Sequence, residues 1–248
     1  MTRGAALVTG AGRRIGRAIA LRLAEAGFDV AVHYRSDPDS ADEVVRAVQA
    51  MGRRAVALKA DLTDEPAARR LISAALAALG PLTVLVNSAS AFEDDRAGAL
   101  GRETWDLHFE TNLRAPLVLA EVFAERAPDG SSVINVLDQR VWKPTPQFFS
   151  YALSKSALWA ATRMLAQAWA PRIRVNGVGP GPTLASIHQD ADAFAAEAAG
   201  TLMGRPVEPS EIADAVAWLV DARSVTGQMN AVDSGQHLGW RTPDVQES

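Results

Sequence analysis

The sequence predicts an α/β fold in which one doubly wound parallel sheet is covered by helices on both faces. Strand-like apolar runs alternate with helix-length stretches from one end of the chain to the other. The runs Val84–Val86 and Val133–Val136 are almost continuously apolar, as expected of strands buried on both faces. Right-handed crossovers between parallel strands place helices on either side of such a sheet. No repeat, low-complexity tract or linker interrupts the pattern, so residues 1–248 are expected to form a single domain.

Seven apolar runs supply the expected strands. In chain order they are Ala5–Val8, Asp29–Val32, Val56–Leu58, Val84–Val86, Val133–Val136, Ile173–Asn176 and Asn230–Val232. The expected helices cover Ile15–Leu23, the segment from Ser40 to Met51, the Ala- and Leu-rich stretch before Gly80, and the segment from about Glu103 to Arg126. Ser40 and Glu43 form a capping-box pair, which predicts that the second helix opens at Ser40.

The stretch Pro182–Pro206 is the least regular part of the chain. Its Ala-rich middle predicts a short mobile helix beside the carboxyl ends of the strands, where ligands bind in sheets of this kind. Residues 183–205 are therefore expected to form a substrate lid.

Composition and charge exclude several classes of function. The chain has no cysteine, so it forms no disulfide and no thiolate metal site, and its four scattered histidines predict no metal. A formal net charge of -4 without a basic excess argues against general nucleic-acid binding. The apolar run that follows Gly4 is too short for a signal peptide or a membrane span, so a cytoplasmic protein is expected.

A glycine-rich segment, Thr9–Gly16, joins the first expected strand to the first expected helix. Glycines let the backbone turn tightly and approach a pyrophosphate, and the helix N-terminus offers free N–H groups and a positive dipole end. The alternative is an ordinary glycine-rich turn without a ligand. Its position after the first strand of an alternating chain favours a dinucleotide site, with Gly10, Arg13, Arg14 and Ile15 as candidate contacts.

The segment His33-Tyr34-Arg35-Ser36 follows the second expected strand and bears on the choice of cofactor. NAD-specific sites usually carry an acidic residue there, which would repel the 2′-phosphate of NADP. Arg35, Ser36 and His33 are instead expected to donate hydrogen bonds to that phosphate. A solvated basic loop is the alternative, but together with the glycine turn the segment favours NADPH.

Tyr151 and Lys155 stand four residues apart, which places both on one face of a helix. A nearby ammonium stabilises a phenolate, so the pKa of Tyr151 is expected to fall below its usual value of about 10. That shift would suit Tyr151 to proton transfer near neutral pH. Because the same spacing occurs on ordinary helix faces, the pair gains meaning only beside the cofactor turn.

Over essentially its whole length the chain resembles the short-chain dehydrogenase/reductase family. The matching features are the Thr9–Gly16 turn, Asp61-Leu62, Asn87-Ser88-Ala89-Ser90, Asn112, Tyr151 with Lys155, Pro180-Gly181, and the closing run from Val225-Thr226-Gly227 to Val232-Asp233. The resemblance implies a Rossmann-type fold, an NADP-dependent oxidoreductase and a homotetramer built around the long helices and the C-terminal strand. Ser234 replaces the glycine that is usual near that edge.

The resemblance also implies a role for each matching residue. Tyr151 would be the general acid, Lys155 would hold the nicotinamide ribose and tune Tyr151, and Asn112 would anchor a water in the proton relay. The further cofactor contacts implied are Asn87, Ser88, Ala89, Pro180, Gly181, Thr183, Asp61 and Leu62. Asp61 would bond the adenine amino group, and a helix cap is its alternative role.

At three positions the chain departs from the common pattern of the family, and at these positions it resembles the pteridine reductases and dihydromonapterin reductases. Most members have a serine thirteen residues before the tyrosine, where this chain has Asp138. Arg14 stands at the usual middle glycine of the turn, and Ser90 replaces the last glycine of the Asn-Asn-Ala-Gly segment. Those enzymes use aspartate, tyrosine and lysine as their catalytic set and share the stretch seen here as Ser90-Ala91-Phe92.

The chemistry of Asp138 suits a ring nitrogen better than a ketone. A serine hydroxyl donates to a developing alkoxide, whereas a carboxylate repels one but accepts or relays a proton beside a nitrogen. Phe92 could stack on a flat heterocycle opposite the nicotinamide, and Arg14 could contact both the cofactor phosphates and the pterin edge. The alternatives are core packing for Phe92 and bonding of backbone amides for Asp138.

The leading hypothesis is NADPH-dependent reduction of a pteridine, from a dihydropterin to a tetrahydropterin. The second is reduction of a ketone or sugar-like substrate, with Asp138 as a tolerated variant. The third is an NADP-binding sensor without catalysis, which has no use for the set Asn112, Tyr151 and Lys155. Trp142 and Trp240 are expected to line the pocket or to pack at an interface.

Overall fold

The computed structural model describes residues 3–185 and 189–240. The strands are β1 (Ala5–Val8), β2 (Asp29–Tyr34), β3 (Ala55–Lys59), β4 (Leu82–Asn87), β5 (Ser131–Val136), β6 (Ile173–Pro180) and β7 (Met229–Val232). The α-helices are α1 (Arg14–Glu25), α2 (Pro38–Ala50), α3 (Glu65–Leu79), α4 (Arg102–Phe109), α5 (Ala115–Arg126), α6 (Phe149–Trp169), α7 (Ala191–Ala199) and α8 (Pro209–Asp221). Shorter helical turns are η1 (Glu110–Arg114, a π-helix), η2 (Gln139–Val141) and η3 (Gln236–Leu238). All strand pairs are parallel, so the expected doubly wound α/β fold is confirmed.

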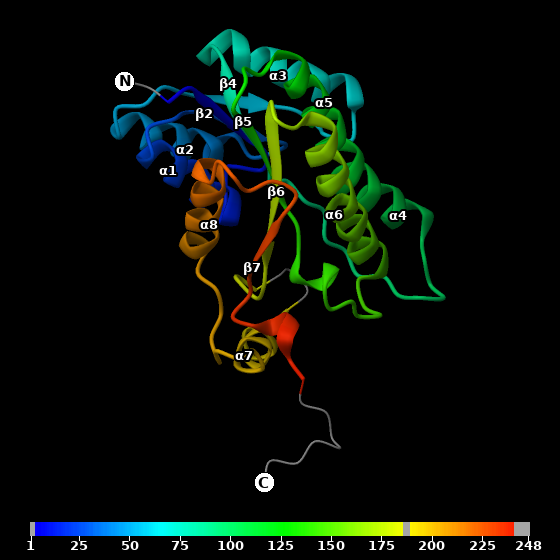
Figure 1. The fold of residues 1–248 in the computed structure, drawn as a ribbon. Coiled ribbons are helices and arrows are strands. Elements are labelled where there is room, and N and C mark those ends of the chain that lie inside the picture. Colours follow the sequence, from blue (N-terminus) through cyan, green and yellow to red (C-terminus); the bar gives the residue numbers. More distant parts are fainter. Residues whose placement is uncertain (1–2, 186–188, 241–248) are drawn as a thin grey trace.

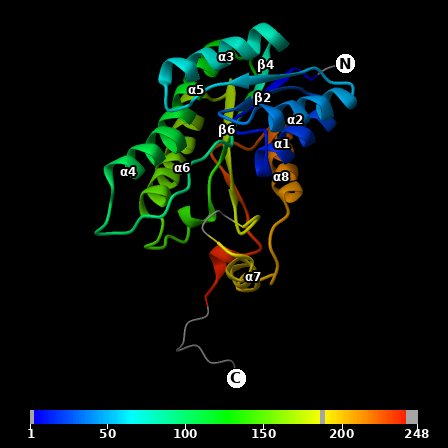
Figure 2. The same cartoon turned by 180° about the vertical axis from the view of Figure 1, so that it is seen from behind.

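Side chains of each strand alternate between two apolar layers. In β1, Ala5 and Leu7 pack with α3 and α5, whereas Ala6 and Val8 pack with α1, α2 and α8. Figures 1 and 2 show α1, α2 and α8 over one face of the sheet and α3, α5 and α6 over the other. Because both faces are covered, the strands contain few polar residues.

The strand order is β3-β2-β1-β4-β5-β6-β7, so the chain changes winding direction between β1 and β4. Ligands bind in such sheets outside the carboxyl ends of the strands at this switch point. The segments after the strands β1 to β6 carry the candidate residues, and the carboxyl ends of these parallel strands all lie at this end.

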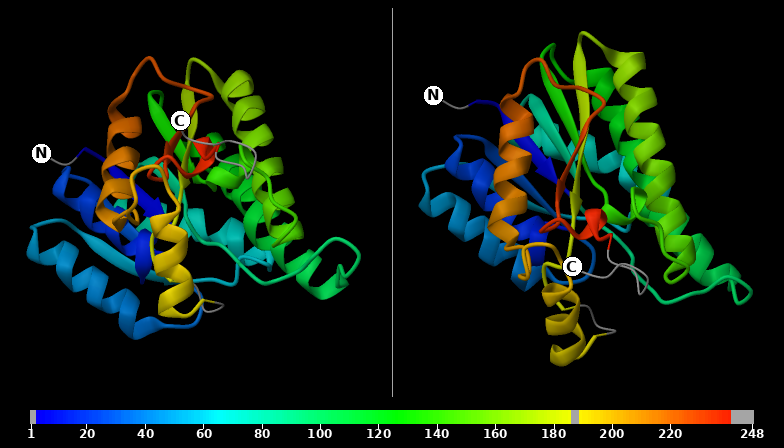
Figure 3. Two further views of the ribbon diagram at one scale, coloured as in Figure 1. Left: turned by 90° about the horizontal axis from the view of Figure 1, so that it is seen from below. Right: turned by 60° about the horizontal axis from the view of Figure 1, so that its bottom comes forward.

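The expected short helix of the irregular stretch is α7. It lies next to η3 at the carboxyl end of the sheet, where the Gln236 side-chain amide donates to Glu197 over 2.9 Å (Figure 3). Residues 186–188 of the expected lid lie outside the described residues.

The predicted capping box of the second helix is wrong. α2 begins at Pro38, and the Asp37 carboxylate accepts from the Ser40 amide (3.2 Å) and from the Ser40 hydroxyl (2.6 Å). An acidic N-cap followed by proline in the first turn starts the helix earlier than the Ser40 and Glu43 pair indicates.

The helical stretch expected from about Glu103 to Arg126 is present without a gap, but its middle is π-helical. α4 passes through the π-helical turn η1 into α5. Pro116, near the start of α5, has no N–H to donate to the preceding turn, which favours a break in the regular hydrogen-bond ladder there. The buried Asn112 lies in η1, and π-helical turns are frequent at functional sites.

With 21 residues, α6 is the longest helix described. Neither α6 nor any other helix of residues 3–185 and 189–240 is long and apolar enough to cross a membrane.

Candidate active site

The turn after β1 is attached to the segment after β4 through Thr9. The Thr9 hydroxyl oxygen accepts from the backbone amides of Ser88 (2.9 Å) and Ala89 (3.0 Å). A Cβ on Gly10 would lie 3.0 Å from the Ala89 Cα, and a Cβ on Gly16 would lie 2.2 Å from the Gly10 carbonyl oxygen. These two glycines therefore let the turn, α1 and the β4 segment approach one another closely.

His33 supports the same turn from inside the protein, where it is 2% exposed. Its Nδ1 accepts from the Gly10 amide (3.0 Å) and its Nε2 donates to the Ala60 carbonyl (3.1 Å). Burial lowers the pKa of His33 to about 4, although Asp61 acts in the opposite direction. The expectation that His33 donates to a cofactor phosphate is corrected, because both ring nitrogens already serve the protein interior.

Arg14 adopts the left-handed backbone conformation, with φ of 52°, which explains why a glycine is usual at this position. Its Nη1 and Nη2 donate to the carbonyls of Ala185 and Leu184, each over 3.0 Å. Arg14 thus connects the glycine-rich turn with the segment after β6.

The ends of β1 and β2 carry a positively charged, exposed rim. Arg13, Arg35 and Ser36 are exposed there, and Tyr34 is partly buried at the end of β2. Asp37, the nearest following carboxylate, is engaged in capping α2.

Asn112 fixes the segment that precedes Phe92. Its Oδ1 accepts from the Ala91 amide (2.8 Å) and the Ser90 hydroxyl (3.1 Å). Its Nδ2 donates to the Ala91 carbonyl (2.9 Å) and to the Ser154 hydroxyl oxygen (3.2 Å). A primary amide offers two acceptor and two donor positions, so the Asn112 side chain is fully used within the protein.

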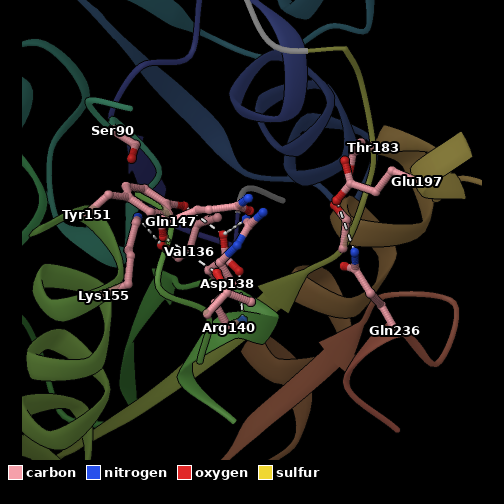
Figure 4. Close-up of polar contacts among 12 residues, drawn as sticks. Ser90, Val136, Asp138, Arg140, Gln147, Tyr151, Lys155, Thr183, Glu197 and Gln236 are labelled. Carbon is pink, nitrogen blue, oxygen red and sulfur yellow. Dashed lines mark hydrogen bonds and ion pairs between the residues drawn. The ribbon is translucent and has the colours of Figure 1, made fainter. Parts of the chain in front are cut away.

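Tyr151 and Asp138 meet at the centre of the site. The phenol hydroxyl of Tyr151 on α6 donates to Asp138 Oδ2 over 2.8 Å (Figure 4). Asp138 follows β5, and its Oδ1 accepts from the Arg140 backbone amide (2.8 Å). Asp138 therefore bonds a backbone amide, as its alternative role predicts, and also contacts the tyrosine.

The expected fall in the Tyr151 pKa is wrong. Burial raises the pKa of the Tyr151 phenol well above its usual value, the Asp138 charge and hydrogen bond raise it further, and Arg140 acts in the opposite direction. The Lys155 ammonium lies 5.8 Å from the Tyr151 ring centroid and donates to the Val136 carbonyl over 2.8 Å. Its own pKa is lowered by burial to about 8. Burial of the phenol is thus the main cause of the upward shift, and the bond to the Asp138 carboxylate adds to it.

Aromatic side chains form one wall of the site. The Phe92 and Phe148 rings stack with centroids 4.3 Å apart, and Tyr151 meets Phe92 edge-on with centroids 4.7 Å apart. Phe148, directly before α6, has φ of 51°, a conformation uncommon for a bulky residue.

A buried hydrogen-bond chain lies behind this wall. His108 Nε2 accepts from the Glu93 amide (3.0 Å), and its Nδ1 donates to the Ser150 hydroxyl oxygen (2.7 Å). The Ser150 hydroxyl and amide donate to Asp95. Burial lowers the pKa of His108, so a neutral imidazole is favoured. This series of hydrogen bonds joins the loop next to Phe92 to the first turn of α6.

The side chains of Asn87 and Asp61 differ in how many of their polar atoms are hydrogen-bonded within the protein. The Asn87 Nδ2 donates to Asn135 over 2.8 Å, whereas its buried Oδ1 has no hydrogen-bond partner among the described residues. Asp61 Oδ1 accepts from the Thr63 amide (3.0 Å) and hydroxyl (2.8 Å). The N-cap of α3 is Asp64, so Asp61 forms a local turn and does not cap that helix.

The segment after β6 packs against the residues after β7. A Cβ on Gly181 would lie 2.6 Å from the Asp233 Cα, so Gly181 is required for close packing there. Pro180 and Thr183 are buried on either side, and the Thr183 hydroxyl donates to the Gly181 carbonyl over 3.0 Å. Ser234 has φ of 52°, which accounts for the glycine that is usual at its position.

Trp142 and Trp240 are 44% and 55% exposed, and Trp142 meets the His237 ring edge-on at 5.1 Å between ring centroids.

Within residues 3–185 and 189–240, no group of three or more His, Asp or Glu side chains is placed to hold a metal ion.

Sequence reasoning missed three contributors to the site: Arg140, Phe148 and the His108–Ser150–Asp95 chain. Arg140 follows Asp138 by two residues and Phe148 precedes Tyr151 by three, so proximity to the catalytic candidates was the available signal. The partners of His108 are far apart in sequence, and no short motif reveals them.

The comparisons with known proteins place the chain among oxidoreductases. The family model described as enoyl-(acyl carrier protein) reductase matches residues 10–237. An uncharacterized oxidoreductase of Methylorubrum extorquens is 36% identical over 93% of this chain and 96% of its own length. A short-chain type dehydrogenase/reductase of Picea abies is 33% identical over 93% of this chain and 91% of its own.

Among solved structures, the FolM alternative dihydrofolate reductase 1 of Brucella canis, complexed with NADP, superposes with a TM-score of 0.95 at 44% identity. The match covers 99% of this chain and 98% of that one. The family model, the relatives and the shared fold therefore show that the chain belongs to the short-chain dehydrogenase/reductase family.

Proposed function

We propose that the protein uses NADPH to reduce a C=N bond of a pteridine, converting a dihydropterin to a tetrahydropterin. The observation that carries this proposal is the 2.8 Å hydrogen bond from Tyr151 to Asp138, which stands where most of the family has a serine. A carboxylate beside the phenol disfavours the alkoxide that a ketone forms and suits protonation of a nitrogen. The resemblance to a FolM alternative dihydrofolate reductase supports the same substrate class.

The residues around the switch point fit NADP. The Asn87 Oδ1, which has no partner among the described residues, offers a buried acceptor after β4, and the close packing at Gly10 and Gly16 brings the start of α1 to the turn after β1, where a pyrophosphate would bind. Arg35 and Ser36, with Arg13, offer donors to a 2′-phosphate, and no carboxylate ends β2. The bound cofactor would supply a hydride from the nicotinamide ring.

The residues proposed to hold the cofactor are Gly10, Arg13, Arg14, Ile15, Tyr34, Arg35, Ser36, Asp61, Leu62, Asn87, Ser88, Ala89, Tyr151, Lys155, Pro180, Gly181 and Thr183. Lys155 is proposed to bind the nicotinamide ribose, since its ammonium lies at the carboxyl end of β5 beside Tyr151. His33 contributes indirectly, through the Gly10 amide that it holds.

Tyr151 and Asp138 are proposed to handle the proton. A hydride delivered to carbon leaves the former C=N nitrogen in need of one proton, and the phenol of Tyr151 remains protonated at neutral pH because its pKa is raised. Asp138 orients that phenol and can pass a proton to it from solvent, because the Asp138 carboxylate is 12% exposed. Since the Asn112 side chain is saturated, Asn112 can hold a relay water only through its backbone carbonyl.

The substrate is proposed to lie between the nicotinamide and the wall formed by Phe92 and Phe148. A planar heterocycle packs against an aromatic wall better than a tetrahedral substrate does. Ser90 and Arg14 are proposed to contact its polar edge, together with Asp138 and Tyr151.

The test follows NADPH consumption with dihydrobiopterin, a second dihydropterin and several simple ketones, each with an NADH control. Turnover of pterins with a preference for NADPH would support the proposal, and turnover of ketones alone would replace the pteridine with a carbonyl substrate. Tyr151→Phe is expected to lower kcat by about 10²- to 10⁴-fold while NADPH affinity stays nearly constant.

Asp138→Ser tests the substrate class directly. It is expected to depress pterin reduction much more than any activity on ketones. The matched control is Asp129→Ser, since Asp129 is an exposed carboxylate in the loop before β5, at the opposite end of the sheet. Equal losses of pterin and ketone activity in Asp138→Ser would remove the argument from the carboxylate.

We also propose a homotetramer. Leu153 and Met164, which are 40% and 66% exposed, leave apolar surface along α6. Sedimentation or light scattering of the purified chain measures the assembly state directly, and a monomer at micromolar concentration would exclude it.

A further inference from the structure

Arg140 contacts the Asp138 carboxylate through two of its groups, the backbone amide and the guanidinium. Its backbone amide donates to Oδ1 over 2.8 Å, and its Nη1 lies 3.5 Å from Oδ2, the oxygen that also accepts from Tyr151. The two side chains are 20% and 12% exposed, so the ion pair is shielded from water, and Coulomb interactions there exceed those at the surface. The 3₁₀ turn η2 brings the amide and the guanidinium of one residue to the same carboxylate.

Arg140 also contacts the aromatic wall. Its guanidinium carbon lies 5.7 Å from the centroid of the Phe148 ring, which stacks on Phe92. Its Nε is buried and has no hydrogen-bond partner in the described part of the chain. An arginine placed for stability alone would be expected to satisfy this donor, because an unmet buried donor is costly. The geometry instead directs Arg140 toward Asp138 and Phe148.

A carboxylate next to the phenol creates a problem that a serine does not. Two negative groups would face each other whenever Tyr151 gives up its proton, and the second charge would oppose that step. The Arg140 guanidinium is the cation that contacts Asp138, whereas the Lys155 ammonium is bonded to the Val136 carbonyl.

We propose that Arg140 is a positioning residue that neutralises Asp138, and that this pairing allows Tyr151 to act as a proton donor beside a carboxylate. The inference rests on Tyr151 and Asp138 being the proton-handling pair of the proposed function. Arg140 acts through Asp138, by holding the Oδ2 atom toward the phenol and offsetting its charge.

The titratable groups that face Tyr151 come from three elements. Asp138 and Arg140 belong to the turn after β5, Lys155 belongs to α6, and His108 of α4 meets the Tyr151 ring at 5.9 Å between centroids. Burial favours the neutral form of His108 by lowering its pKa. Among the described residues, removal of Arg140 therefore leaves Lys155 as the cation that offsets the charge of Asp138.

The experiment is a double-mutant cycle of Arg140→Gln and Asp138→Asn, with Arg140→Lys as the charge-preserving variant. The readout is the pH dependence of kcat for whichever substrate the wild type reduces. Arg46→Gln, an exposed arginine on α2, is the matched control. Arg140→Gln alone is expected to lower kcat about tenfold or more and to move the alkaline limb to higher pH. In the Asp138→Asn background the same change is expected to alter kcat less than about twofold.

A second readout does not depend on any substrate. The chain contains two tyrosines, so in a Tyr34→Phe background the ultraviolet absorbance of tyrosinate reports Tyr151 alone. Asp138→Asn is expected to lower the pH at which Tyr151 ionises, Arg140→Gln to raise it, and Arg140→Lys to leave it near the wild-type value. If pterins are not reduced but the pH at which Tyr151 ionises changes among the variants as stated, the pteridine proposal fails and the role of Arg140 stands.

The proposal is overturned if the effects of Arg140→Gln and Asp138→Asn multiply independently, or if Arg140→Lys behaves like Arg140→Gln in both readouts. Either result would assign Arg140 to support of the Phe148 ring. If Arg140→Gln does not fold, Arg140→Lys and Asp138→Asn still decide between the two roles, since only neutralisation predicts rescue by lysine.

Discussion

Acid is expected to destabilise the protein through His33. The neutral His33 ring accepts from the Gly10 amide and donates to the Ala60 carbonyl, which ties the phosphate-binding turn to the end of β3. A proton on Nδ1 turns this acceptor into a donor that faces the Gly10 N–H. The folded structure therefore resists protonation, and the pKa of His33 falls to about 4 from an ordinary 6.5.

The sign and size of the effect follow from these two values. Because the folded-state pKa lies below the unfolded-state pKa, the unfolded chain binds more protons between them, and stability rises with pH. The contribution is fully present above about pH 6.5 and is lost as the pH falls toward about 4. Between pH of about 7.5 and about 5 the loss amounts to about 2 kcal/mol.

Urea unfolding at these two pH values measures the effect, with His33→Gln as the reference. Glutamine keeps an acceptor and a donor but does not titrate in this range. The wild type is expected to lose about 2 kcal/mol more than the variant on acidification, since the remaining groups titrate alike in both. Binding of NADP⁺, which tolerates acid, should weaken over the same interval in the wild type only. Parallel pH profiles for the two proteins would refute the reasoning.

Three further substitutions test other parts of the site. Gly16→Ala places a Cβ 2.2 Å from the Gly10 carbonyl, so a loss of about 1–3 kcal/mol in urea unfolding is expected, and wild-type stability would contradict the packing argument. Ser150→Ala leaves the buried Asp95 short of a donor and is expected to cost about 1–3 kcal/mol by the same measurement; no loss would mean that the hydrogen-bond chain is dispensable. Arg35→Gln is expected to reduce the preference of kcat/KM for NADPH over NADH by about tenfold or more, and an unchanged preference would remove Arg35 from the 2′-phosphate site.

The sheet could be predicted because strand identity depends on local pattern. The expected first strand, Ala5–Val8, has the bounds of β1, and the other six differ from their strands only at the ends. Helix α8 was not expected, although Glu208 and Glu211 form its capping box and Ile212 and Val216 recur on its buried face. The local pattern of this segment is therefore sufficient to predict a helix.

The electrostatics of the site could not be predicted in the same way. Sequence spacing brings Tyr151 and Lys155 to one helix face, but the group that contacts the phenol is Asp138, from another element. The direction of the Tyr151 pKa shift depends on that contact and on burial, and neither is encoded in a local pattern. His33 was misjudged for the same reason, because its partners Gly10 and Ala60 follow different strands.

The π-helical turn η1 limits where the chain tolerates changes in length. His108 bonds Ser150 and Asn112 bonds Ser154. These two side-chain hydrogen bonds, called rungs below, join the α4–η1 segment to α6, and each spans 42 residues of sequence. Each residue of an α-helix turns the helix by about 100°, so a one-residue deletion between the rungs rotates one away while the other stays in place. The loop at 144–146 lies outside both segments that carry these bonds, and extra residues there leave both bonds paired. Homologues and engineered variants are therefore expected to vary in length in that loop and to keep the spacing between His108 and Asn112.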